Sequence, residues 1–136
     1  EVAVEAGIAK VVIDVRRGDG PAAAFNFTQP ALTTTDEMIE REPDAVAGAV
    51  RAIVRTQKAL KEDVSLATRV GEALFPDKES ALIARLIERD LPFYDAAISD
   101  ELVAGMNQFA EAAGMLDGPV PYDQIVATRY RELWTA

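Results

Sequence analysis

The chain has 136 residues, of which 49% are hydrophobic and 27% are charged, and its formal net charge is −9. This length predicts one domain, and this composition is that of a folded globular protein rather than of a disordered chain. The acidic balance argues against a nucleic-acid partner, because neutralising phosphates requires a basic surface. No apolar run approaches the roughly 20 residues of a transmembrane helix.

The chain contains no cysteine and no histidine. The first absence excludes disulfides, thiolate catalysis and zinc–thiolate sites, and the second removes the commonest general base together with the commonest metal ligand. We therefore predict that the protein is not an enzyme and has no catalytic residue, no metal site and no cofactor. An enzyme that works with carboxylates, such as Asp14, Asp19 and Asp95, stays open as an alternative.

The first extended segment is expected at residues 8–15, an apolar run that includes the consecutive β-branched residues 11–13. Such a run is typical of a strand that is buried on both faces of a parallel sheet between helices. Residues 1–7 have the pattern of a helix end, with Gly7 suited to the C′ position. The sequence therefore predicts a central parallel strand at residues 11–15.

A second extended segment is expected at residues 25–33, after a loop imposed by Gly18, Gly20 and Pro21. Pro30 cannot donate a hydrogen bond to a neighbouring strand, so this segment belongs at a sheet edge or crosses between sheets. In open parallel sheets, ligands bind at the carboxyl ends of strands. The loop is therefore expected near a binding site.

Capping signals and prolines divide the remainder of the chain into helices. Thr34 and Glu37 have the spacing of a capping box, and Pro43 suits the first turn of a longer helix. Either Asp77 or Ser80 is expected to cap a later helix. The predicted helices span residues 36–42, 43–61, 64–74 and 100–113, the last capped by Ser99 and ended by Gly114, together with a helix that begins after the Asp77 or Ser80 cap and ends at residue 90, and a short helix from residue 122.

The long helices carry apolar side chains at helical spacing, which predicts the face that each of them buries. We expect these faces to supply most of the core. The predicted inner-face residues are Val46, Ala49, Val50, Ile53, Val54, Gln57 and Leu60; Leu82, Ile83, Leu86 and Ile87; and Leu102, Val103, Met106, Phe109, Ala110 and Ala113.

The order of these motifs resembles the C-terminal portion of ABC-transporter solute-binding proteins of the nitrate/sulfonate/taurine type, a superfamily that includes binders of the thiamine pyrimidine precursor. The likeness is carried by residues 12–20, 30–34, 39–52, 91–95 and 126–130. It implies the α/β class: a helix-rich C-terminal portion of a two-lobed periplasmic-binding-protein-like fold, with a parallel sheet flanked by helices. Residues 1–136 are then expected to be a single domain or a fragment of such a protein.

The resemblance also implies a function. The protein is expected to bind a small molecule, either an anion or a heteroaromatic compound, and to present it to an ABC permease in the periplasm or another extracytoplasmic compartment. A homodimer or a swapped assembly is possible for this part of the protein. An enzyme on the same scaffold and a helical interaction module stay open as alternatives. A pyrimidine synthase of the superfamily relies on a histidine, which this chain lacks.

The candidate ligand contacts come from the two extended segments and from the connector at residues 91–95. A strand that crosses a cleft presents alternate side chains to it, and an arginine can grip an anionic group in a forked contact. These candidates are Asn26, Phe27, Thr28, Arg16, Arg17 and Tyr94. For Phe27, packing in the core is the alternative to ligand contact, and for Tyr94 the alternative is a structural hydrogen bond of its hydroxyl.

Overall fold

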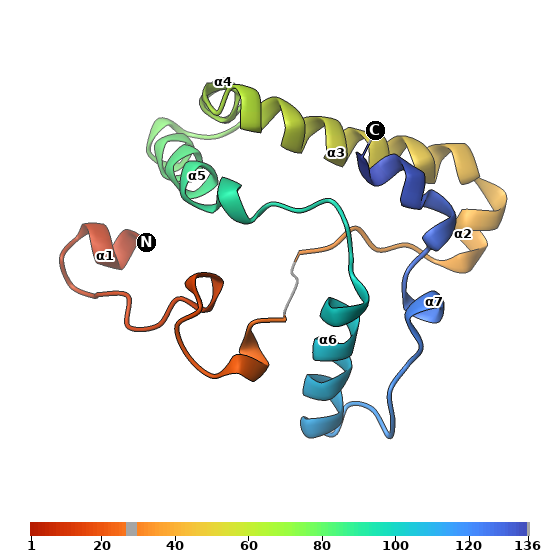
Figure 1. The fold of residues 1–136 in the computed structure, drawn as a ribbon. Helices are drawn as coiled ribbons and strands as arrows, with labels where there is room; N and C mark the ends of the chain where they lie inside the picture. The colour runs from red at the N-terminus through yellow and green to blue at the C-terminus, as the bar shows by residue number, and fades with distance from the viewer. Residues whose placement is uncertain (27–29, 136) are drawn as a thin grey trace. The chain divides into compact units, whose positions relative to one another are not determined.

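The fold is known from a computed structural model that describes residues 1–26 and 30–135. The chain divides into two compact units (Figure 1). Unit 1 consists of residues 1–33 and 97–131, and unit 2 consists of residues 34–96 and 132–136. None of the described helices combines the length and the apolar character needed to cross a membrane.

Helices make up the regular structure of both units. Unit 1 contains α1 (Val2–Glu5), η1 (Val15–Arg17), η2 (Ala22–Ala24), α6 (Asp100–Ala112) and α7 (Tyr122–Ile125). Unit 2 contains α2 (Asp36–Arg41), α3 (Pro43–Glu62), α4 (Ser65–Leu74), α5 (Asp77–Asp90) and η3 (Leu91–Phe93). The 3-10 helix η4 (Thr128–Thr135) begins in unit 1 and ends in unit 2.

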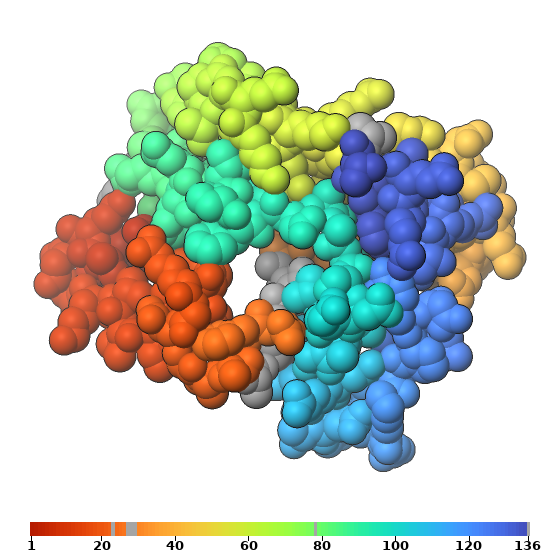
Figure 2. Space-filling model, in the orientation of Figure 1, coloured from red at the N-terminus to blue at the C-terminus, as the bar shows by residue number. Residues whose placement is uncertain are grey.

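The predicted parallel sheet is wrong, because the described part of the chain contains no strand and is helix-rich. Residues 8–14 follow an irregular path on the surface, drawn in red to orange in Figures 1 and 2. Ile8 is 81% exposed and Val12 is 78% exposed. Residues 10–13 form no hydrogen bond with the described part of the chain. Because a strand needs a partner for its backbone groups, β-branched side chains alone do not make one.

The second predicted strand is also absent from the described residues. The chain forms η2 and a turn before residue 26, and residues 30–35 then follow an irregular path to α2. Phe27 lies outside the described residues. The prediction for Gly7 is confirmed: its φ of +71° places it just after α1 in the left-handed conformation that favours glycine.

The longest helix, α3, was predicted within one residue of its end and begins at Pro43 as expected. Of the seven predicted inner-face residues, Val46, Val54 and Leu60 are buried and the residues at 49, 50 and 57 are half-buried, but Ile53 is 40% exposed. Periodicity places Ile53 on the same face. The difference arises because α2, α4 and η3 pack against particular turns of α3, and periodicity does not show which turns a neighbour covers.

Two of the capping predictions for helices of unit 2 are wrong. The Oγ1 atom of Thr35, rather than that of Thr34, accepts a hydrogen bond from the Met38 amide at 3.2 Å and caps α2. No side chain caps α5, so neither Asp77 nor Ser80 has that role. Ser80 is instead buried against α4, where a Cβ atom at Gly71 would lie 2.8 Å from its Oγ atom. A small residue at position 71 therefore permits the close approach of α4 and α5.

Candidate functional site

Helix α6 is the framework of unit 1. The Oγ atom of Ser99 accepts a hydrogen bond from the Leu102 amide at 3.2 Å, so the predicted N-cap is confirmed. Gly114 follows the helix with a φ of +69°, as expected for its C-terminal end. Val103 is buried as predicted, whereas Phe109 is 46% exposed and does not belong to the inner face.

A buried asparagine fastens the loop after α6 to the helix. The Nδ2 atom of Asn107 donates a hydrogen bond to the Val120 carbonyl at 2.8 Å, and the Val120 amide donates to Asn107 Oδ1 at 3.1 Å. Sequence analysis missed this contact because an asparagine within a helix suggests an exposed surface. Its position four residues after Val103 was the available signal, since residues i and i+4 share a helix face.

The phenol of Tyr122 fastens α7 to the start of α6. Its hydroxyl donates a hydrogen bond to the Ile98 carbonyl at 2.5 Å and accepts one from Arg131 Nη2 at 3.3 Å. The guanidinium carbon of Arg131 also lies 5.6 Å from the centre of the Tyr122 ring, within the range of a cation–π contact. These contacts hold α7 beside the start of α6, and residues 98 and 125 line the same pocket.

Close approach of the backbone at Asn26 brings the N-terminal segment onto α6. A Cβ atom at Gly105 would overlap the backbone carbonyl of Asn26, so only glycine allows this approach. Glycine within a helix costs about 1 kcal/mol relative to alanine. We attribute the glycine at position 105 to this contact.

These elements line a half-open pocket of about 480 Å³ within unit 1. This volume lies within the roughly 300–1,000 Å³ that is typical of small-molecule sites. Val103 and Val126 are buried in its wall, while Leu32 and Ile125 are about half exposed at its rim. The described lining residues are Pro30, Ala31, Leu32, Thr33, Ile98, Leu102, Val103, Met106, Ile125 and Val126.

The pocket lining combines apolar side chains with unpaired backbone groups. No described lining residue carries a charge, and Thr33 alone among them has a side-chain hydroxyl. The backbone groups of residues 31–33 form no hydrogen bond with the described part of the chain. Residues 31–33 are exposed and bring peptide N–H and C=O groups without a protein partner to the edge of an apolar pocket, which suits a ligand that has both an apolar face and polar edge atoms.

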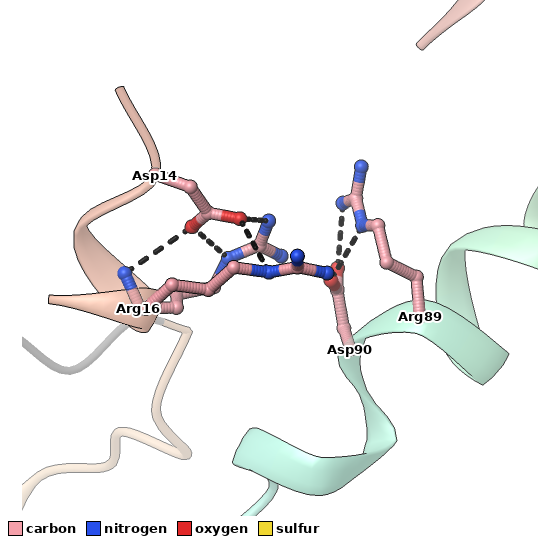
Figure 3. Close-up of polar contacts among 5 residues, drawn as sticks. Asp14, Arg16, Arg89 and Asp90 are labelled. Carbon is pink, nitrogen blue, oxygen red and sulfur yellow. Dashed lines mark hydrogen bonds and ion pairs between the residues drawn. The ribbon is translucent and has the colours of Figure 1, made fainter. Parts of the chain in front are cut away.

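Arg16 and Arg17 lie outside the pocket lining and contact a carboxylate of their own segment. Arg16 Nε is 2.8 Å from Asp14 Oδ1 and Arg16 Nη2 is 2.7 Å from Asp14 Oδ2, a forked ion pair (Figure 3). Arg17 Nε lies 3.7 Å from Asp14 Oδ2. The hydrogen bonds from Arg16 hold the pKa of Asp14 below its ordinary value of 3.8. The forked contact predicted for a ligand is thus made with Asp14.

Neither Asn26 nor Tyr94 lines the described pocket. Asn26 lies beside α6 with an exposed side chain. Tyr94 belongs to unit 2, where its carbonyl accepts a hydrogen bond from Lys61 Nζ at 3.1 Å. Phe27 and Thr28 lie outside the described residues. Unit 2 has a forked pair of its own, in which Arg89 holds Asp90 with nitrogen–oxygen distances of 2.7 and 2.9 Å (Figure 3).

The carboxylates considered for catalysis are not assembled into one site. Asp14 is held in its ionised form by Arg16, which makes it a poor proton donor. Asp14 and Asp19 belong to unit 1, whereas Asp95 belongs to unit 2. Within residues 1–26 and 30–135, no group of three or more potential metal ligands occurs.

No family model, curated protein or solved structure matches the chain. Its function is therefore inferred from the pocket of unit 1 and from the motifs that carry the resemblance to solute-binding proteins.

Proposed function

We propose that the protein is the solute-binding component of an ABC importer and that the pocket of unit 1 binds a flat, neutral heteroaromatic molecule. The observation that carries this proposal is the apolar pocket of about 480 Å³, at whose edge the backbone groups of residues 31–33 have no hydrogen-bond partner in the described part of the chain. In this proposal the protein binds its ligand without altering it chemically.

The walls of the pocket favour an aromatic ring over a small anion. Burying apolar surface contributes about 25 cal/mol per Å² at aliphatic side chains such as Val103, Met106 and Val126. An anion in the same place would lose its hydration without a cationic partner among the described lining residues. Of the two ligand classes that the resemblance implies, the heteroaromatic class therefore fits better.

The segment at residues 30–33 supplies the polar part of recognition. A heteroaromatic ring has donor and acceptor atoms at its edge, and the backbone at residues 31–33 and the Thr33 hydroxyl can pair with them. A buried hydrogen bond left unmade costs about 1–3 kcal/mol, so these groups discriminate against a purely hydrocarbon ligand. Apolar contact then provides affinity and the backbone provides orientation.

The transport role is supported by the motifs rather than by the pocket. Residues 30–34 and 39–52 carry the likeness to the importer family, and within the second stretch Pro43 begins α3. From this likeness we place the protein outside the cytoplasmic membrane, where it presents its ligand to a permease. A negative net charge of −9 is compatible with a freely diffusing carrier.

A ligand screen with matched variants tests the proposal. The wild-type protein is heated with a neutral aminopyrimidine, with nitrate or with taurine, and any compound that raises the melting temperature is then titrated by calorimetry. Leu32→Ala removes a side chain from the pocket rim, and Leu74→Ala is the control, because that leucine is exposed on α4 in unit 2.

We expect the aminopyrimidine to stabilise the protein, by about 2.7 kcal/mol at a hundredfold excess over Kd, and the anions to have no effect. Leu32→Ala should weaken binding roughly tenfold through lost apolar contact, while Leu74→Ala leaves Kd unchanged. Stabilisation by the anions alone, or equal affinity in Leu32→Ala and the wild type, would contradict the proposed ligand class.

A further inference from the structure

Met106 has a side chain unlike any other in the described pocket lining. It is the one residue there that carries a sulfur atom, and the other apolar lining residues are alanine, proline, valine, leucine and isoleucine. A methionine side chain is unbranched and has three rotatable bonds, so it adapts its shape more readily than a branched aliphatic one. Its thioether sulfur is polarizable and forms favourable contacts with aromatic rings. This residue can therefore decide which rings the pocket prefers.

Contacts on both sides of Met106 hold the backbone of α6 in place. Gly105 is buried where the backbone of Asn26 approaches the helix so closely that no Cβ atom fits. Asn107 is also buried, and it exchanges two hydrogen bonds with the backbone of Val120, at 2.8 and 3.1 Å. Because the helix is fixed at both neighbouring residues, the adaptability at position 106 belongs to the side chain alone.

The position of Met106 along α6 leaves this side chain open to the pocket. Leu102 precedes it by four residues and Val103 by three, so the three side chains share one face of the helix. Val103 is buried, whereas Met106 is half-buried. Met106 is also the last residue of α6 in the described lining. A ligand in the pocket therefore meets a thioether that keeps part of its surface free.

We propose that Met106 sets the ligand preference of the pocket by placing its thioether against an aromatic ring, so that an aromatic ligand is favoured over a saturated one of similar size. This inference rests on the proposed function and extends it, because burial of apolar surface by itself favours both kinds of ring. A sulfur–aromatic contact strengthens binding by about two- to tenfold. The flexible side chain can follow rings with different substituents, so several related compounds should bind.

A leucine at position 106 separates the role of the sulfur from that of apolar contact. Methionine and leucine have similar volumes, and exchanging them usually costs little stability. Met106→Leu is therefore the test variant, and thermal unfolding checks that it stays folded. Met115→Leu is the matched control, because Met115 is 70% exposed after the end of α6 and does not line the described pocket.

The test uses a neutral aminopyrimidine together with benzyl alcohol and cyclohexylmethanol. The two alcohols share a hydroxymethyl group and differ in whether the ring is aromatic. We expect Met106→Leu to bind the aminopyrimidine about two- to tenfold more weakly than the wild type does, and Met115→Leu to bind it equally well. The preference of the wild type for benzyl alcohol over cyclohexylmethanol should fall by a similar factor in Met106→Leu.

Methyl NMR of the wild-type protein reports on the same contact without a substitution. The chain has three methionines, and Met38 and Met115 do not line the described pocket, so their ε-methyl signals serve as internal references. Benzyl alcohol should shift the Met106 signal saturably through its ring current, and cyclohexylmethanol, which has no ring current, should shift it much less.

The outcomes separate this inference from the proposed function. Equal shifts of the Met106 signal with both alcohols, or the same alcohol preference in Met106→Leu and the wild type, would overturn the role of Met106 even if the aminopyrimidine binds. A wild-type protein that binds benzyl alcohol with the expected Met106 effect but does not bind the aminopyrimidine would contradict the proposed ligand class and support the role of Met106. Binding of none of the three compounds would overturn both.

Discussion

Helix α5 and residues 8–13 are both rich in aliphatic side chains, but α5 packs against α4 while residues 8–13 stay irregular and exposed. A helix closes its backbone hydrogen bonds within its own sequence, so an apolar face is enough to attach it to a neighbour. A strand needs another segment for the same bonds. The comparison shows that the pocket of unit 1 forms because particular contacts hold irregular segments against α6. Unit 2, in contrast, is held together by the packing of helix faces.

The largest expected effect comes from a substitution that disrupts the packing of the helices in unit 2. Val54 is 3% exposed, so Val54→Asp buries a charge without a partner in the core of unit 2. We expect the free energy of unfolding to fall by about 4 kcal/mol or more. Ile53→Asp is the control on the same helix and should cost less than about 1 kcal/mol. Denaturant unfolding measures both, and similar losses would show that the face is assigned wrongly.

The next prediction concerns the close contact between residue 26 and α6. Gly105→Ala places a methyl group in the space of the Asn26 carbonyl and should destabilise the protein by about 1–3 kcal/mol. Gly48→Ala is the matched control, since a Cβ atom there meets nothing within 4 Å. It should stabilise α3 by about 0.5–1 kcal/mol. If thermal unfolding shows that both variants are more stable than the wild type, residue 105 does not make this close contact with residue 26.

An effect of similar size is expected where a polar side chain holds a loop. Asn107→Ala leaves the amide and the carbonyl of Val120 without their partner and should cost about 1–3 kcal/mol. The exposed neighbour Gln108 provides the control variant Gln108→Ala. Hydrogen exchange at the Val120 amide reports directly on the bond, and unchanged protection in Asn107→Ala would show that the contact is absent in solution.

The smallest effect is the pH dependence of the Asp14 ion pair. Because Arg16 lowers the pKa of Asp14 below 3.8, the stability from this pair is full above that pH and is lost as the pH falls through the folded value. Arg16→Ala should return the pKa toward its ordinary value, and Arg17→Ala should change it less, since Arg17 makes only the longer contact. Carboxyl NMR titration measures both, and equal changes would contradict the forked geometry.

Sequence patterns predicted the helices of this protein well, because caps, prolines and apolar periodicity are local signals. The end of α5 was predicted at the observed residue although both candidate caps were wrong, and the bounds of α3 and α6 were predicted within one residue. The sheet was wrong because β-branched residues show a preference for strands and do not show a partner. The pocket was missed because Leu102, Val103 and Met106 were assigned to the core, and periodicity does not distinguish a packed face from a pocket wall.

The most direct test of the proposed binding site is a methyl NMR titration of the wild-type protein with a neutral aminopyrimidine. The proposal predicts that the methyl signals of Val103, Met106 and Ile125 shift together and saturably, while those of Ile39 in unit 2 stay in place. Saturable shifts confined to residues near Arg16 or Tyr94, with the pocket methyl groups unchanged, would contradict the proposal and would place the ligand at the site that the sequence first suggested.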